Sequence, residues 1–251
     1  MEYLSVEEAQ ERDGLRLVLT AGVPGPFSEA AKALFRHHHV DFLPVRQIGG
    51  RENPELVAWT RHRNAPIALY NDEAPRVRWL EILDLAERLG NGPSLFPTSI
   101  DDRIRMVGLI NEIAGENSFI WQARILMLHE TVLAVGEEKA RRNPMLKDYL
   151  YDQTAVEPAR ERIHGVISYL TGMISQNSSG YLVGNSFTAA DIYFAYVSNL
   201  IRPQPHELNP MPQGLRTSYE LLEKLFGEFD PVLVEFRDRI FEQHLQLPVD
   251  F

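Results

Sequence analysis

The side chains best suited to chemistry in this sequence are histidines, arginines and hydroxyl residues, because the chain contains no cysteine. The missing thiols exclude disulfides, thiolate metal sites and a cysteine nucleophile. His37, His38 and His39 look like a metal cluster, but three consecutive residues at the end of a helix point in different directions. No acidic or His-x-x-x-His partner accompanies them, so we expect no metal site.

A small basic patch lies further along the chain, where Arg61, His62, Arg63 and Asn64 precede Pro66. Guanidinium groups bind carboxylates through paired hydrogen bonds, although such a cluster is also typical of a solvated loop. The patch is local, because the whole chain carries a net charge of −10. We therefore expect neither nucleic acid nor an anionic membrane as a partner.

The composition is that of a globular protein with a sizeable core. Of the 251 residues 44% are hydrophobic and 24% charged, and no apolar run is long enough to span a bilayer. This length allows one large domain or two modest ones. The start, residues 1–8, is acidic where a secretory or transit segment would be basic, so we expect a cytoplasmic protein.

The first third of the chain alternates between strand and helix patterns. Leu15–Thr20 predicts a strand, residues 27–35 a helix, and residues 40–45 a second strand in which Pro44 favours an edge position. These three elements predict a right-handed β-α-β unit. Residues 1–13 are polar and acidic, and we expect them to form a solvated tail or a short helix before the fold begins.

The pattern then continues to the end of this region. Residues 54–62 predict a short helix, and residues 67–70 a strand that returns after a turn as a short strand near residues 75–77. A third helix follows from Trp79 to Leu89, so the predicted order is β-α-β-α-β-β-α. The Gly- and Pro-rich residues 90–97 predict a linker.

Everything after the linker has the pattern of helices. We place one domain at residues 14–90 and an all-helical domain at residues 100–246, whose first long helix has a predicted kink at residues 115–118. Later in this region Thr188 and Asp191 predict a capping box. The residues that follow, 192–197, are apolar on every face, which places this helix in a core.

That capped helix carries a resemblance to a known family. Together with the preceding Tyr181-Leu182-Val183-Gly184 it resembles the buried sixth helix of the glutathione transferase superfamily, whose pattern here is a Gly, a Ser or Thr, and an Ala-Asp pair. The β-α-β-α-β-β-α order is similar to the thioredoxin-like half of the same family. The resemblance covers roughly residues 14–246 and implies an α+β fold, with an N-terminal thioredoxin-like domain and an all-helical C-terminal domain.

The resemblance also implies a site for glutathione as co-substrate. In that family the proline before the third strand is cis, and the backbone of the preceding residue pairs with the cysteinyl part of glutathione. These positions fall here on Pro66 and Ala65, and Arg63 in the basic patch is a candidate for the glycine carboxylate.

The sequence departs from the family pattern where the catalytic hydroxyl or thiol belongs. Many members have the pattern Ser/Cys-Pro-x-Ser/Cys just after the first strand. Its first position falls here on Gly25 and its last on Ser28, while Thr20 ends the first strand. Ser28 and Thr20 are therefore the candidate groups that hydrogen-bond the glutathione sulfur and favour its thiolate. A merely helix-capping Ser28 and stabilisation by backbone amides at the start of the helix remain open alternatives.

A second departure concerns the start of the third helix. The family has an acidic residue followed by Ser there, which hold the γ-glutamyl end of glutathione, and the aligned pair here is Arg78-Trp79. An arginine cannot accept from an ammonium group, but it can bind a carboxylate. The γ-glutamyl end is thus bound differently or not at all, unless Arg78 is a surface residue and Trp79 a core aromatic.

Three functions follow from these features. The first is a glutathione transferase that transfers the glutathione thiolate to a small apolar electrophile, as a homodimer by resemblance. The second is a non-catalytic interaction module with the same fold, supported by the departures at Gly25 and Arg78-Trp79. The third is a specialised glutathione-dependent etherase or lyase.

Overall fold

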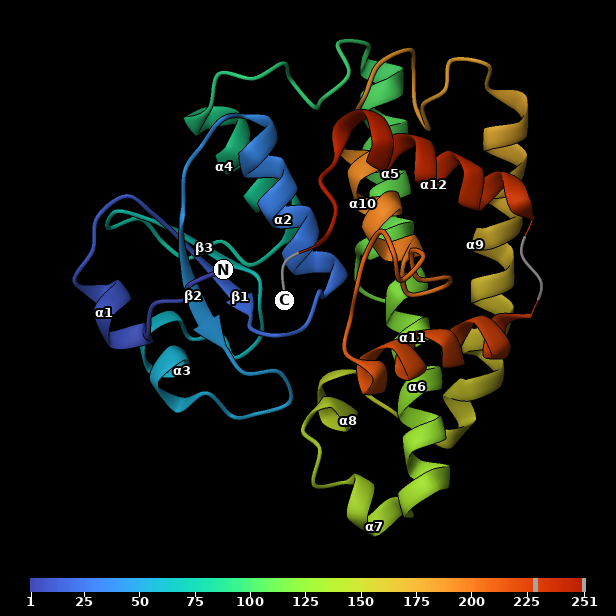
Figure 1. The fold of residues 1–251 in the computed structure, drawn as a ribbon, viewed down its shortest axis with the longest axis horizontal. Helices are drawn as coiled ribbons and strands as arrows, with labels where there is room; N and C mark the ends of the chain where they lie inside the picture. Colours follow the sequence, from blue (N-terminus) through green and yellow to red (C-terminus); the bar gives the residue numbers. More distant parts are fainter. Residues whose placement is uncertain (228–229, 250–251) are drawn as a thin grey trace. The chain divides into compact units, whose positions relative to one another are not determined.

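A mixed sheet of three strands lies in the first of two units into which the chain divides. The computed structural model describes residues 1–227 and 230–249; the first unit comprises Met1–Leu95 together with Val249, and the second Phe96–Pro248. The strands are β1 (Leu15–Thr20), β2 (Leu43–Gln47) and β3 (Ile67–Tyr70), in the order β2-β1-β3. β1 pairs in parallel with β2 and antiparallel with β3 (Figure 1).

Helices cover both faces of this sheet. α2 (Pro26–His37) and α4 (Trp79–Leu89) contact each other on one side, and α3 (Pro54–Thr60) lies on the other (Figure 1). Because the central strand is covered on both faces, its residues from Leu15 to Leu19 are all buried. This explains why its sequence is a nearly continuous apolar run rather than an alternating one.

The prediction that the fold begins after residue 13 is wrong. Leu4 forms a bridge with Val45 at the outer edge of β2, and α1 (Val6–Gln10) buries Val6 and Ala9 in the same cluster as Val45. The Leu4 amide donates to the Pro44 carbonyl at 2.9 Å. Proline lacks only the donor, so its carbonyl still attracts a strand-like segment to the edge of the sheet.

The predicted fourth strand is reduced to a single antiparallel bridge between Ala68 and Arg76. Both backbone hydrogen bonds of that bridge are 2.9 Å long. Pairing does not extend further, because Pro75 has no amide hydrogen and Arg78 already caps α4. The predicted α+β class is confirmed, with this one strand missing.

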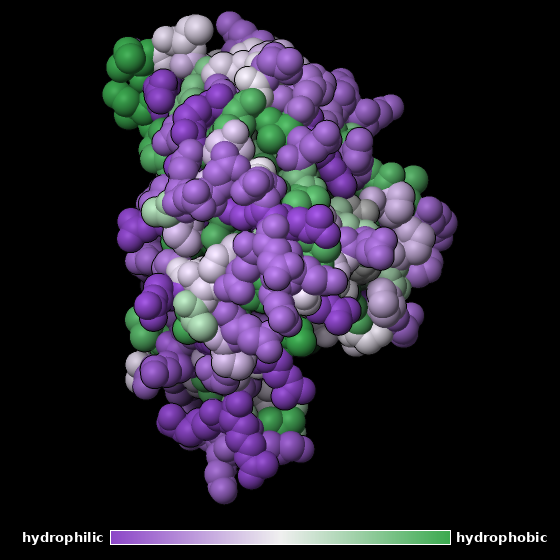
Figure 2. All heavy atoms as spheres, turned by 90° about the vertical axis from the view of Figure 1, so that its left-hand side faces the viewer, coloured by the Kyte–Doolittle hydropathy of each residue, from purple (hydrophilic) through white to green (hydrophobic). Residues whose placement is uncertain are grey.

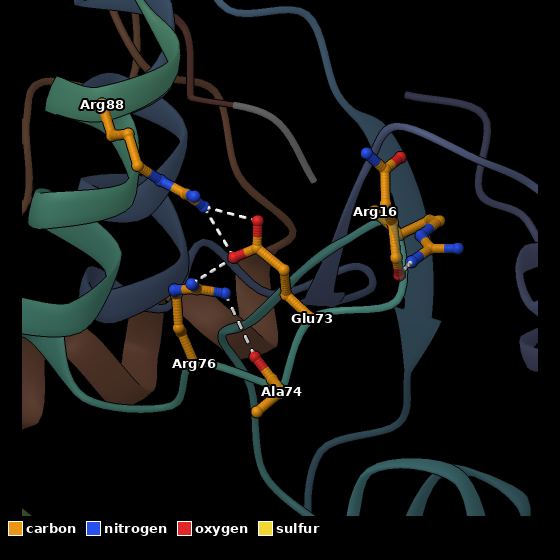
Figure 3. Close-up of polar contacts among 6 residues, drawn as sticks. Arg16, Glu73, Ala74, Arg76 and Arg88 are labelled. Carbon is orange, nitrogen blue, oxygen red and sulfur yellow. Dashed lines mark hydrogen bonds and ion pairs between the residues drawn. The ribbon is translucent and has the colours of Figure 1, made fainter.

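A carboxylate fixes the turn after β3 to helix α4. Figure 3 shows Glu73 between the guanidinium groups of Arg76 and Arg88, and Arg88 lies 2.9 and 2.6 Å from the two carboxylate oxygens. The hydrogen bond from Arg88 is the largest cause that lowers the pKa of Glu73. The carbonyl of Asn71, in the same turn, accepts a hydrogen bond from the buried Arg16 of β1. Charged groups therefore hold the turn after β3 against the last turn of α4 and against β1.

In its described residues the second unit has helices joined by loops and no strand. The predicted long helix with a kink is instead two helices, which end and begin around Gly115–Ser118. A Cβ on Gly115 would lie 2.6 Å from the Asn111 carbonyl oxygen, so the chain needs glycine where it leaves the first of them. The helices are α5 (Ile100–Ala114), α6 (Phe119–Val135), α7 (Glu137–Ala140), α8 (Met145–Asp148), η1 (Gln153–Ala155), α9 (Val156–Gln176), α10 (Ala189–Ser198), α11 (Gln213–Phe226) and α12 (Pro231–His244).

Helix α10 is buried along its whole length, as predicted, and packs against α5 and α12. The predicted capping box is present at its start. The carboxylate of Asp191 accepts hydrogen bonds from the Thr188 amide at 2.8 Å, the Thr188 hydroxyl at 2.9 Å and the Leu182 amide at 2.8 Å. One buried acid thus joins the helix to the loop that precedes it.

The surface turned toward the viewer in Figure 2 is mainly hydrophilic, with apolar residues scattered over it. None of the described helices combines the length and the apolar character needed to cross a membrane.

Candidate functional site

The candidate site lies at the end of the sheet where β1 and β2 finish and β3 begins. Thr20, the last residue of β1, is paired with Gln47, the last residue of β2. On the other side Val18 is paired with Ile67, the first residue of β3. Ala65 and Pro66, which directly precede β3, therefore lie beside the end of β1, at the level of Thr20.

The peptide bond between Ala65 and Pro66 is cis, as predicted. Ala65 is half-buried and packs against the apolar cluster that contains Val18 and Ile67. The backbone of Ala65 is thus held at the sheet end by packing on both strands.

The loop after β1 leads into α2 without a side-chain cap. Gly25 is the N-cap residue, no side chain hydrogen-bonds the first amides, and Pro26 is the first helical residue. Ser28 lies in this first turn and is only 3% exposed. The positive end of the helix macrodipole is thus available to an anion at this point.

Two charged residues of α2 are buried, which the sequence pattern did not indicate. Lys32 and Glu29 form an ion pair at 2.7 Å, with side-chain exposures of 1% and 4%. The only signal in the sequence is that they are three residues apart on a predicted helix. A charge pair at this depth requires hydrogen-bonding partners, and it stands close to the open helix start.

Gln47 is the centre of a hydrogen-bond network that sequence reasoning missed. The Thr20 hydroxyl donates to its Oε1 at 2.8 Å, and its Nε2 donates to the carbonyls of Ile48 at 3.0 Å and Arg63 at 3.3 Å. Gln47 is only 2% exposed. A glutamine that ends an otherwise apolar strand, level with a threonine on the neighbouring strand, is the signal that could have identified it.

The network closes into a ring through Asn53. The Asn53 side-chain nitrogen donates to the carbonyls of Ile48 and Arg51, both at 2.9 Å. The Arg51 carbonyl in turn accepts from Arg63 at 3.4 Å. Asn53 has a φ of 45°, a left-handed conformation that asparagine tolerates better than most residues. The loop that carries Arg63 is therefore fixed by two amide side chains.

Arg78 is the N-cap residue of α4, and its side chain is exposed. Arg76 forms the bridge with Ala68, so Arg78, two residues further on, begins α4 near the start of β3. Glu81 accepts from the amides of Val77 at 3.1 Å and Arg78 at 3.2 Å. The nearest acid of this helix is thus engaged in capping, and the charge that α4 presents here is positive.

Most of the residues nominated from the sequence come together at this sheet end, while two of them do not. Ser28 is buried inside the first turn of α2, and Trp79 is half-buried at the first position of α4. The residues that share the sheet end are Thr20, Arg63, Ala65, Pro66 and Arg78.

Two of the three consecutive histidines contact α4 or the segment after it, and their rings, those of His37 and His38, lie edge to face with centroids 5.1 Å apart. The His37 ring lies 2.9 Å from the Pro93 carbonyl, and His38, 1% exposed, lies 3.2 Å from Glu87. Burial lowers the pKa of His38. Among residues 1–227 and 230–249 no group of three or more His, Asp or Glu side chains has the arrangement of a metal site.

Comparison with known proteins agrees with this architecture. Residues 141–230 match the family model described as "Glutathione S-transferase, C-terminal domain". Over these residues the chain is similar to the C-terminal domain of glutathione S-transferases. A search of curated protein sequences gives no significant match to this chain.

Solved structures with the same fold cover nearly the whole chain. A glutathione S-transferase from Methylobacterium radiotolerans, in complex with glutathione sulfonate, has a TM-score of 0.63 at 17% identity, over 94% of this chain and 95% of that one. One from Methylobacillus flagellatus with glutathione bound has a TM-score of 0.63 at 10% identity, over 92% and 96%. The beta-etherase LigF from Sphingobium has a TM-score of 0.60 at 16% identity, over 90% and 99%. At these identities the likeness establishes the fold alone.

Proposed function

We propose that this protein is a glutathione transferase that binds glutathione at the end of the sheet in its first unit. The observation that carries the proposal is the convergence of Thr20, Ala65 and Arg78 at one sheet end, beside the uncapped start of α2. An extended peptide can pair with the Ala65 backbone, while Arg63 and Arg78 attract its carboxylates. This choice of ligand is supported by the two similar transferase structures that contain glutathione or its sulfonate.

The reaction in this proposal is nucleophilic attack by the glutathione thiolate. The sulfur forms a bond to an electrophilic carbon of a small apolar substrate, and the leaving group departs with the electron pair of the bond that breaks. The chain has no cysteine, so the nucleophile is that of glutathione. The amides and dipole at the start of α2 lower the cost of the negative charge on sulfur, and Ser28, in the first turn of that helix, is the candidate side chain for this task.

Two alternatives use the same fold. An etherase is supported by the similarity to LigF, whose TM-score of 0.60 is close to those of the transferases. A non-catalytic interaction module is supported by Gly25 and Arg78, which depart from the family pattern at a single site. The proposal includes a homodimeric assembly, by resemblance, and a cytoplasmic location.

The test of the proposed activity is a conjugation assay with chromogenic apolar electrophiles. Purified protein with glutathione is expected to accelerate conjugation above the uncatalysed rate, and Ser28→Ala is compared with the parent by the ultraviolet absorbance of bound thiolate. Turnover of aryl ethers but not of halides would favour the etherase. Binding of glutathione without turnover of either substrate class would contradict the transferase proposal.

A further inference from the structure

The side-chain amide of Gln47 has one orientation in its surroundings. Its Nε2 faces two carbonyl oxygens, those of Ile48 at 3.0 Å and Arg63 at 3.3 Å. A flipped amide would bring its own oxygen against both of these acceptors, with no donor between them. The orientation is therefore decided by the two carbonyls, and Oε1 must face Thr20.

This orientation decides what the Thr20 hydroxyl can do. Oε1 of Gln47 is an acceptor only, so at 2.8 Å the single hydroxyl proton of Thr20 must lie between the two oxygens. A Cβ on Gly49 would lie 3.2 Å from the Thr20 methyl carbon, so a glycine at this position leaves room for the methyl group of Thr20. Thr20, which is half-buried, then presents oxygen lone pairs to its surroundings rather than a proton.

The same amide holds the loop that leads to Ala65. The Arg63 carbonyl accepts from Gln47, and the Arg63 guanidinium donates to the Arg51 carbonyl at 3.4 Å, which Asn53 also contacts. Gln47 therefore joins both the end of β1 and the Arg63 loop to the end of β2.

We propose that Gln47 is a positioning residue of the glutathione site, which keeps Thr20 as a hydrogen-bond acceptor and holds the Arg63 loop against β2. The ligand group that meets Thr20 must then be a donor, such as an amide N–H, an ammonium or a protonated thiol. An anionic sulfur is not such a group, so the thiolate is stabilised elsewhere, at the start of α2. The identity of the ligand rests on the proposed function, but the roles of Gln47 and Thr20 can be measured without it.

The first test follows the Thr20 hydroxyl proton by NMR in the ligand-free full chain. We expect slow exchange with water in the parent and in Gln47→Glu, which retains an acceptor, and rapid exchange in Gln47→Leu. The Thr60 hydroxyl, which donates to the Leu56 carbonyl at 2.8 Å, is the internal reference and should stay protected in all three. Rapid exchange at Thr20 in the parent, or protection that persists in Gln47→Leu, would overturn the assignment.

Hydrogen exchange of the backbone tests the loop. Gln47→Glu has no donor for the two carbonyls, so amides in residues 61–65 should exchange about tenfold faster, the factor expected for one lost hydrogen bond. Thr20→Val should leave these amides unchanged. Equal exchange in Gln47→Glu and the parent would exclude the loop-holding role. Because Gln47→Glu is read by both methods, failure of Gln47→Leu to fold would not remove the test.

Titration of bound glutathione tests the consequence for the ligand. Gln47→Leu releases the Thr20 proton for donation, so the thiol pKa, followed by ultraviolet absorbance, should fall, and the fall should be absent in the double variant Gln47→Leu/Thr20→Val. A rise of the thiol pKa in Thr20→Val alone would show that Thr20 donates to sulfur and would overturn the proposal. If the parent does not bind glutathione, the proposed function fails, while the hydroxyl and amide exchange still decide the role of Gln47.

Discussion

Asp191 shows how a single buried group can set the pH dependence of stability. The residue is 0% exposed, and burial raises the pKa of its carboxyl group to about 6, although hydrogen bonds from Leu182 and Thr188 act in the opposite direction. The folded state therefore binds a proton that the unfolded chain releases at a lower pH. The corresponding stability is fully present below the unfolded pKa and is lost as pH rises through about 6.

Replacement of Asp191 by Asn isolates this contribution. The free energy of unfolding of the parent minus that of Asp191→Asn should fall by about 2.5 kcal/mol as pH rises from about 4 to about 7, because the pKa difference of roughly two units is lost in the variant. Urea unfolding at a series of pH values measures it. Parallel curves for the two proteins would show that burial does not perturb this carboxyl group.

At the scale of residues, local signals were predictable and long-range ones were not. The capping box formed by Thr188 and Asp191 could be predicted because both residues lie within one helical turn. The cis bond at Pro66 was predicted by resemblance alone. The contact between Thr20 and Gln47 joins residues far apart in the sequence, and nothing in the local pattern of a strand end indicates which side chain will face it.

Helix α1 and its bridge are the clearest case of an element that the sequence pattern concealed. Only two of its residues, Val6 and Ala9, face the core, which is too few to produce a recognisable period. The segment is held by its contacts with β2 and α3. Its stability therefore comes from tertiary packing rather than from helix propensity.

Val6→Ala tests whether α1 belongs to the folded core. Val6 is 8% exposed, so removal of its two methyl groups should cost about 1 to 2 kcal/mol of unfolding free energy at roughly 0.8 kcal/mol per buried carbon. Glu7→Ala on the exposed side of the same helix is the control. If both variants unfold at the urea midpoint of the parent, α1 does not contribute to the core.

The start of α4 carries the strongest specificity prediction at the scale of elements. Arg78 is exposed and makes no contact that α4 needs, since Glu81 caps the helix through backbone amides. Arg78→Ala should weaken glutathione binding about tenfold, the loss typical of one charge-assisted hydrogen bond, with an unchanged melting temperature. Isothermal calorimetry measures the affinity.

The control for Arg78 is Arg12→Ala, an exposed arginine just before β1, at the opposite end of that strand from Thr20. Its affinity should equal that of the parent. An equal loss in the two variants would point to general electrostatic attraction, and no loss in Arg78→Ala would rule out contact with the ligand.

Element types and most boundaries could be predicted because the apolar patterns are distinct: β1 is a continuous apolar run, α2 and α9 have a helical period, and α10 is apolar on every face. The exceptions are places where tertiary structure overrides the pattern. The predicted second strand of the hairpin is a single bridge at Arg76, because Pro75 precedes this residue and the helix cap Arg78 follows it closely. Gly115 ends a helix that the apolar period would continue.

At the scale of the whole molecule, charge distribution links the fold to its ligand. The chain has a net charge of −10, yet Arg61, Arg63 and Arg78 precede or flank Pro66 at the sheet end. A basic site in an acidic protein concentrates an anionic ligand locally without binding polyanions in general. The fold class could be predicted from the order of elements, whereas the site's chemistry depends on contacts between loops that only the structure reveals.

The most direct test of the account is the binding of glutathione to the purified full chain at neutral pH, measured by isothermal calorimetry. We predict a saturable isotherm with one site per chain, and a higher melting temperature in the presence of glutathione, because a ligand that binds only the folded state stabilises it. Absence of both heat and thermal stabilisation, in protein shown to be folded by circular dichroism, would contradict the assignment of the sheet end as a glutathione site.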